Sequence, residues 1–267
     1  MRGAFKIECR LQPDGRSGIG YQEVSAPWHL SKPYWDGEVL LVQAVNATAG
    51  VFAGDHLAME VRVEPGASVL LTSPSASRIH TMPQGEATLT QQISVADGAW
   101  LEWMPELFIP QRGCRYRQET TIDLAAGSSA YLVETLAPGR VAHGEAFAFE
   151  RIAWRTHVRI NDRLVLAEHY HLNPSDHSLA DVRGTPPRYF ANVMIASPHR
   201  LPVRDWQEAA LAWSDPEVHT GITQPAPDLV LVRMLADSSD AMKNALARLR
   251  ELVAGTLPKL RQSARKL

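Results

Sequence analysis

Residues Ile93-Ser-Val-Ala-Asp-Gly98-Ala-Trp-Leu-Glu-Trp103 read as a strand with alternating apolar and polar side chains, a tight glycine turn, and a second strand. Two further stretches repeat this pattern: Val61-Arg-Val-Glu-Pro-Gly66-Ala-Ser-Val-Leu-Leu71 and Ile122-Asp-Leu-Ala-Ala-Gly127-Ser-Ser-Ala-Tyr-Leu132. Their glycines recur about 30 residues apart, a period typical of stacked repeats. Because one such unit cannot bury its apolar face alone, stacking should build one elongated β core. A sandwich with similar hairpins is the alternative.

The rest of the chain extends this β core. A fourth strand pair, Trp154 to Glu168, turns at the hairpin dipeptide Asn161-Asp162, so we place the repetitive core at about 39–172. Prolines punctuate 173–228 and leave room for one short helix around Asp205 to Trp213. A buried strand and a C-terminal helix fill 229–267, with Ser238 or Ser239 as N-cap and Gly255 at the end.

We therefore predict a single domain over 1–267. The predicted fold is mainly β, an elongated β-helix-like or stacked β-sheet body with about two α-helices, one of them near the C-terminus.

Composition argues against several classes of protein. The chain of 267 residues is 45% hydrophobic, enough for a substantial core, and has 27 basic and 29 acidic residues with a formal net charge of −2. Nucleic-acid binding normally requires a basic face, so we expect no nucleic-acid partner. There is no signal-peptide pattern and no apolar run long enough for a membrane helix, so we expect no membrane partner. Two distant cysteines, Cys9 and Cys114, favour a reducing, cytoplasmic setting.

The turn Asn46-Ala-Thr-Ala-Gly-Val-Phe-Ala-Gly-Asp55 does not have the chemistry of a phosphate-binding loop. Such a loop needs lysine and a hydroxyl after its second glycine, whereas this chain has Asp55 and His56 there. The spacing Gly50-x-x-x-Gly54 does not match a dinucleotide fingerprint either. An alternating segment follows, so the turn joins two strands.

The chain has two candidate sets of catalytic groups. Cys114 and His143 would be a nucleophile and base only if the fold brought them together. A β-helix also suggests a carbohydrate-active hydrolase with paired carboxylates, for which the candidates are Asp55, Glu102 and Glu106. Aromatic content of 7% is low for a sugar-binding surface.

His169-x-His171 is a candidate metal site, because an alternating strand places both imidazoles on one face. Asp176 and His177 follow in a loop, and imidazole suits nickel, copper or zinc. The simpler interpretation is that these histidines are ordinary polar positions of a half-exposed strand. The same simpler interpretation applies to His56 and His80.

Three segments together resemble the UreD (UreH) family of urease accessory proteins. The family's N-P-T-G-G-x-x-G-G-D turn is matched by Asn46, Thr48, Gly50, Gly54 and Asp55. Its L-T-T-P-x-A-x-K-x-Y segment is matched by Leu71-Thr-Ser-Pro-Ser-Ala-Ser-Arg-Ile-His80, through Thr72, Ser73, Pro74 and Arg78. Its L-E-W-x-P-Q-E segment is matched by Leu101-Glu-Trp-Met-Pro-Glu-Leu107, through Glu102, Trp103, Pro105 and Glu106.

The resemblance implies a non-enzymatic scaffold for nickel insertion into urease. Such a protein binds UreF, through it the GTPase UreG, and the urease apoprotein. It has no tightly bound cofactor, and nickel is in transit through the β body. We expect Asp55 and Glu102 to line or brace this passage. The alternatives are that Asp55 caps its own turn and that Glu102, pointing away from Leu101 and Trp103, lies on a solvated face.

Other departures and surfaces give further expectations. Ala49 and Ala53 replace family glycines and should have ordinary backbone angles here. The C-terminal helix either docks on UreF or, by default, packs on its own β body. Trp100 and Trp103 should face opposite sides of a strand, which would leave one of them exposed as a partner anchor.

Overall fold

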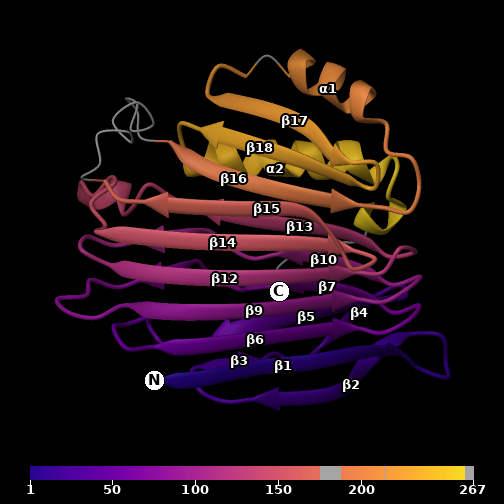
Figure 1. The fold of residues 1–267 in the computed structure, drawn as a ribbon, viewed down its shortest axis with the longest axis horizontal. Coiled ribbons are helices and arrows are strands. Elements are labelled where there is room, and N and C mark those ends of the chain that lie inside the picture. The colour runs from indigo at the N-terminus through magenta and orange to yellow at the C-terminus, as the bar shows by residue number, and fades with distance from the viewer. Residues whose placement is uncertain (175–187, 214, 262–267) are drawn as a thin grey trace.

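The computed structural model describes residues 1–174, 188–213 and 215–261 (Figure 1). Strands make up 52% of the chain and form a β-solenoid of about four turns, with two α-helices. The prediction of a mainly β, β-helix-like body with a helix near the C-terminus is confirmed. No helix in the described ranges is both long and apolar enough to cross a bilayer.

Seven strands form the first sheet, in the order β15-β14-β12-β9-β6-β1-β2 (Figure 1). From β1 to β14 neighbouring strands are parallel, while β2 and β15 pair antiparallel at the two edges. The strands are β1 (Arg2–Leu11), β2 (Ser17–Val24), β6 (His56–Val63), β9 (Ala87–Val95), β12 (Arg115–Leu124), β14 (Arg151–Ile160) and β15 (Arg163–Leu172).

Eleven strands form the second sheet, whose main path is β17-β18-β16-β13-β10-β7-β5-β3. Its strands are β3 (Trp28–Leu30), β4 (Tyr34–Asp36), β5 (Val39–Asn46), β7 (Ser68–Thr72), β8 (Ser77–Ile79), β10 (Trp100–Met104), β11 (Phe108–Pro110), β13 (Ser129–Leu136), β16 (Tyr189–Ala196), β17 (Val218–Ala226) and β18 (Leu229–Ala236). Strands β5, β7, β10 and β13 are parallel neighbours.

The repeats seen in the sequence are the turns of this solenoid. In each repeat a strand of the seven-stranded sheet ends at the glycine turn, and a strand of the eleven-stranded sheet begins after it, as from β9 to β10 around Gly98. The hairpin at Asn161-Asp162 joins β14 to β15, and both turn residues have positive φ, of 49° and 61°. Successive coils are tied at the turns, since Asp97 Oδ1 accepts the backbone N–H of Gly127 at 2.9 Å.

The stretch 173–228 is more regular than its prolines suggested. It contains the expected short helix, α1 (Val203–Ala212), but also β16 and β17, so its interpretation as irregular was wrong. Strand β16 is an interior strand between β13 and β18. The apolar run Ala191-Asn-Val-Met-Ile-Ala196 lies within this proline-rich part of the sequence, and Pro198 follows it in a loop, where it breaks no sheet hydrogen bond.

Most of the buried apolar residues belong to two cores. One lies between the two sheets and includes Ile93, Leu101 and Leu132, and the other lies between the eleven-stranded sheet and α2 (Ser239–Ala254). Ser238 caps α2 by accepting the N–H of Ala241 at 3.1 Å, as one of the two expected caps. The expectation that α2 packs on its own β body is confirmed, because its apolar stripe is buried there.

The two tryptophans of β10 show the same layering. Trp100 belongs to the core under α2 and Trp103 to the core between the sheets, so they face opposite sides as predicted. Both are buried, at 2% and 8% exposure, and the expectation of an exposed anchor was wrong. The helix that covers Trp100 comes from the far end of the chain, which a local pattern cannot reveal.

Candidate functional site

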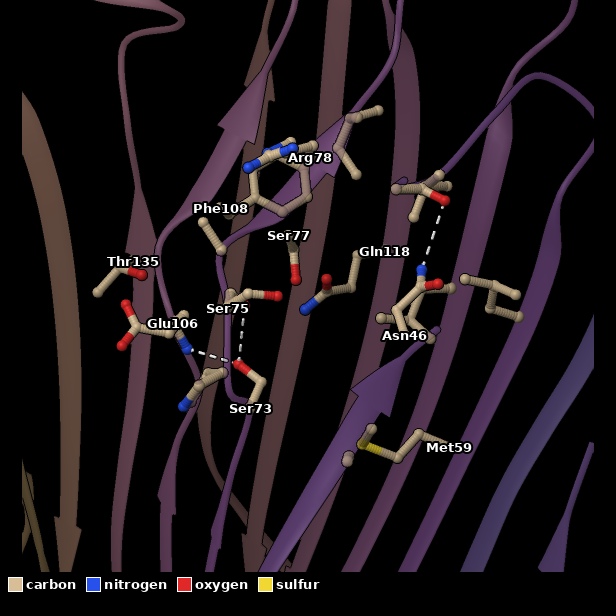
Figure 2. A pocket seen from close by; sticks show the side chains of 18 of the residues that line it. Asn46, Met59, Ser73, Ser75, Ser77, Arg78, Glu106, Phe108, Gln118 and Thr135 are labelled. Carbon is tan, nitrogen blue, oxygen red and sulfur yellow. Dashed lines mark hydrogen bonds between the residues drawn. The ribbon is translucent and has the colours of Figure 1, made fainter. Parts of the chain in front are cut away.

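The three motif segments meet at one pocket of about 190 Å³, which we call the signature pocket (Figure 2). It opens where β5, β7 and β10 end, because parallel strands of one sheet deliver their following loops to the same edge. The motif residues that line it are Asn46, Thr48, Gly50, Ser73, Pro74, Arg78, Trp103, Pro105 and Glu106.

The turn after β5 is held by its own side chains. Asn46 Oδ1 accepts the backbone N–H and the hydroxyl of Thr48, at 3.0 and 2.7 Å. Val51 then pairs with Ile79 of β8 in an isolated parallel bridge. Positive φ outside glycine occurs among the described residues only at Phe147, Asn161 and Asp162, so Ala49 and Ala53 have ordinary backbone angles, as expected.

The second and third segments are tied to each other. Ser73 Oγ accepts the backbone N–H of Glu106 at 2.8 Å, and Thr72 Oγ1 donates to the carbonyl of Met104 at 2.6 Å. Figure 2 shows Ser75 and Ser77 beside this junction, with Ser77 and Gln118 pointing into the same space. The mouth of the pocket is therefore rich in hydroxyl and amide groups.

The side chain of Asp55 forms hydrogen bonds with its own turn and with the first residue of the chain. Its Oδ2 accepts the N–H of Phe52 at 2.8 Å, and its Oδ1 accepts from the Met1 α-amino group at 2.8 Å. Its side chain is buried and is not among the described residues that line the signature pocket. This is the turn-capping geometry that the sequence offered as the alternative to a passage role.

Glu102 points away from Leu101 and Trp103, as alternation predicts, but the face it occupies is not solvated. Its side chain is 1% exposed and pairs with Arg250 of α2 through Oε1–Nε and Oε2–Nη2 distances of 2.6 and 3.0 Å. Burial raises the pKa of Glu102, and the Arg250 guanidinium opposes that shift. Glu102 therefore holds α2 on the sheet, on the opposite face from the core between the sheets.

A row of polar side chains crosses the interior between the sheets, starting at the signature pocket. Gln91, Thr120 and Thr156 are register partners on β9, β12 and β14, and we call them the polar row. All three are buried. Gln91 Oε1 accepts from Gln118 Nε2 at 2.9 Å and from Thr120 Oγ1 at 3.0 Å.

The polar row ends at Glu134 of β13, a residue that the sequence analysis missed. Glu134 is 8% exposed, and its Oε1 accepts from Thr156 Oγ1 at 2.8 Å. Its Oε2 accepts from Asn192 Nδ2 at 3.2 Å. Burial raises the pKa of Glu134, and the hydrogen bonds from Thr156 and Asn192 offset this in part. A lone carboxylate inside the apolar run Tyr131-Leu-Val-Glu-Thr-Leu136 was the available signal.

Glu134 also lines a second cavity of about 550 Å³, which we call the apolar pocket. Apolar and aromatic side chains dominate its wall, including Phe147, Phe149, Ile152, Leu172 and Phe190. Glu134, Thr135 and Trp154 line both pockets. Glu134 therefore stands where the hydroxyl-lined entrance and the apolar cavity meet.

The free energy of unfolding should depend on pH through Glu134. Because its folded pKa is raised, its contribution to stability is fully present below the unfolded pKa, about 4.3, and is lost as pH rises through the folded pKa. We therefore expect Glu134→Gln to be more stable than the parent near pH 8, and the difference in free energy of unfolding between the two proteins to shrink towards about pH 5. Urea titrations at several pH values measure this difference. A difference that grows as the pH falls would contradict the assignment.

The remaining candidates are not assembled into sites. His169 and His171 are exposed on the same face of β15, and nowhere in the described ranges do three or more His, Cys, Asp or Glu side chains gather as metal ligands. Asp176 and His177 lie outside the described residues. His56 Nδ1 is 2.9 Å from Thr88 Oγ1, and His80 stacks on Phe52 with ring centroids 4.4 Å apart.

Neither catalytic candidate gains support from the geometry. Cys114 is fully buried and burial raises the pKa of its thiol to about 12, the opposite of what a nucleophile needs, while His143 is exposed at the end of the short 3-10 helix Val141–His143. Of the three carboxylates considered for a hydrolase, Asp55 is bound by its turn and Glu102 by Arg250. Only Glu106 lines the signature pocket.

Comparison with known proteins gives a consistent result over the whole length. The profile of the family described as UreD urease accessory protein matches residues 1–266. The chain is 37% identical over 269 residues to the Urease accessory protein UreD of Opitutus terrae, covering 99% of this chain and 98% of that relative. It is 34% identical to the Urease accessory protein UreD of Deinococcus radiodurans, covering 94% of this chain and 89% of that relative.

Proposed function

Because the chain belongs to the UreD family of urease accessory proteins, we propose that it is a non-enzymatic scaffold for nickel insertion into urease. In this proposal it acts in the cytoplasm, binds UreF and through it UreG, and docks on the urease apoprotein. Nickel passes through its β body as cargo and is not retained as a cofactor. The observation that supports a passage is the meeting of all three motif segments at one pocket that continues into the polar row.

The chemistry of this interior suits transit. A passage must replace part of the hydration shell of a divalent cation without trapping it. Amide and hydroxyl oxygens do this weakly, whereas thiolate or imidazole clusters bind nickel tightly. Among the described residues that line the signature pocket there is neither cysteine nor histidine.

The direct test is reconstitution with partners. The chain should co-purify with UreF, and with UreG when UreF is present, and the assembly should activate apo-urease in a nickel-dependent way. Activation to the same level when this chain is omitted would overturn the proposal, as would failure to form the UreF complex.

A variant that narrows the entrance gives a sharper prediction. Ser77→Phe places a ring at the mouth of the signature pocket and should slow nickel-dependent activation about tenfold, while the UreF complex still forms. Ser94→Phe on β9 is the matched control, because Ser94 lies on the outer, half-exposed face of the seven-stranded sheet. Equal rates for the two variants would show that the pocket is not on the route.

A further inference from the structure

The outer edge of β2 has no neighbouring strand. This strand ends the seven-stranded sheet and pairs with β1 on one side, so its other side is open among the described residues (Figure 1). In an antiparallel edge strand, alternate backbone N–H and C=O groups point away from the sheet, where another chain can bind them. The carbonyl of Ser17 accepts from Trp35 Nε1 at 2.7 Å, but no other side chain of the described residues caps the backbone of 17–24. The edge can therefore accept an extended segment.

A groove of about 470 Å³ lies along this edge and has aromatic side chains in its wall. Tyr21 of β2 and Trp35 of β4 line it, and they are 52% and 49% exposed. Tyr34, beside Trp35 in the chain, is exposed as well. Exposed tyrosine and tryptophan side chains are frequent anchors of protein interfaces, because they bury a large area at a low entropic cost.

Two glycines of β2 line the same groove, Gly18 and Gly20. Gly20 has no register partner on β1 and is the extra residue of a β-bulge, and glycine in a strand often marks the close approach of another backbone. A Cβ at Gly20 would lie 2.8 Å from both Cδ and Nε of Arg10, so the Arg10 side chain lies across this position. The absence of a side chain at Gly20 therefore places a guanidinium group beside the groove.

The cations that border the groove have no carboxylate partner. Arg10, Arg16 in the turn between β1 and β2, and Lys32 before β4 are exposed, and none of them takes part in an ion pair found among the described residues. The neighbouring carboxylates of Glu23 and Glu38 are each paired with a lysine. A segment that binds here and carries its own carboxylates would supply the missing partners.

We propose that the open edge of β2 binds an extended, acidic segment of a partner protein, which adds a strand to the seven-stranded sheet. Main-chain hydrogen bonds to β2 give affinity, while the aromatic wall and the guanidinium of Arg10 select apolar and acidic side chains. A second copy of the chain fits less well, because two-fold pairing joins identical surfaces and would set the same cations against each other. The inference rests on the proposed function for the identity of the two proteins used as probes.

The test follows amide hydrogen exchange in the full-length chain alone, in its UreF complex, and in that complex with apo-urease. One of the two binding steps should slow exchange of the amides of 18–24 at least tenfold, because a new strand protects them. Arg10→Glu and Trp35→Ala should each weaken that same step at least tenfold. Added salt should weaken it more in the parent than in Arg10→Glu.

Arg155→Glu is the matched control. Arg155 is exposed on β14, near the opposite end of the same sheet, and it too has no ion pair among the described residues. This variant should bind both proteins as the parent does. Melting curves identify a variant that does not fold, and if Trp35→Ala is one, Arg10→Glu at its exposed position decides the question.

Three results would overturn the proposal. Protection of β2 in neither binding step, or equal weakening by Arg10→Glu and Arg155→Glu, would exclude the edge as a docking surface, and normal activation of apo-urease would then leave the scaffold role standing. Self-association of the parent that protects β2 would assign the edge to a second copy. A parent chain that binds neither UreF nor apo-urease would remove the proposed function and this inference with it.

Discussion

Glu102→Ala is expected to lower the free energy of unfolding by about 3–5 kcal/mol, because it leaves the Arg250 guanidinium facing a buried surface without its carboxylate. For a chain of this size, that corresponds to a fall in melting temperature on the order of 10 °C. The backbone amides of α2 should also exchange with solvent faster than in the parent, since the pair joins that helix to β10. Thermal and urea unfolding, with hydrogen exchange in α2, measure both effects.

The control replaces both partners of the pair. Glu102→Leu combined with Arg250→Met removes the charges together, and replacing a buried pair by apolar side chains of similar volume is often neutral or stabilising. We therefore expect the double variant to regain most of the lost stability and to activate apo-urease at the parental rate. A folded, stable double variant that fails in activation would show that Glu102 acts on the cargo, as the sequence had suggested, and not on α2.

Glu102 also shows how far local sequence patterns reach. The alternation in Trp100-Leu-Glu-Trp103 correctly predicted which face of the strand each of the other three side chains occupies. It could not say what lies beyond each face, because the partner, Arg250, is 148 residues away in the chain. The interpretation as a solvated position was wrong for that reason alone.

The solenoid itself was predictable because its information is local and repeated. The glycine turn and its flanking strands occur several times, so the repeat period can be recognised even where the spacing of one copy differs. Strands β16 and β17 occur once each, in a part of the sequence that is rich in proline, and their pairing depends on the rest of the sheet. A single unrepeated strand gives a much weaker signal.

Only part of the candidate site could be predicted from local sequence patterns. The motif segments pointed to residues that do line one pocket, such as Asn46, Ser73 and Glu106. The charge of Asp55 suggested a role in the passage, although a short acidic side chain at the end of a turn can accept hydrogen bonds from its own backbone. Glu134 lies outside all three segments, and only the register of β13 against β16 and its contact with Thr156 reveal its surroundings.

Gly50→Ala is the second change expected to have a large effect. Gly50 has φ of 150°, and a Cβ there would lie 2.4 Å from the carbonyl oxygen of Arg78 and 2.9 Å from the His80 ring. The Arg78 oxygen is a backbone atom that accepts the N–H of Val51 at 2.8 Å, so it cannot move without breaking the bridge that holds the turn on β8. Strain and overpacking together should cost about 3 kcal/mol.

Gly54→Ala separates the clash from the backbone angle. Gly54 also has positive φ, of 77°, but nothing lies within 4 Å of its Cβ position, so only the conformational cost of about 1–2 kcal/mol applies. Urea midpoints at constant m-value measure the difference. Because the turn of Gly50 forms one wall of the signature pocket, Gly50→Ala should also impair nickel-dependent activation more than Gly54→Ala does. Equal losses of activation in both variants would mean that the packing of the turn against β8 does not determine the shape of the pocket entrance.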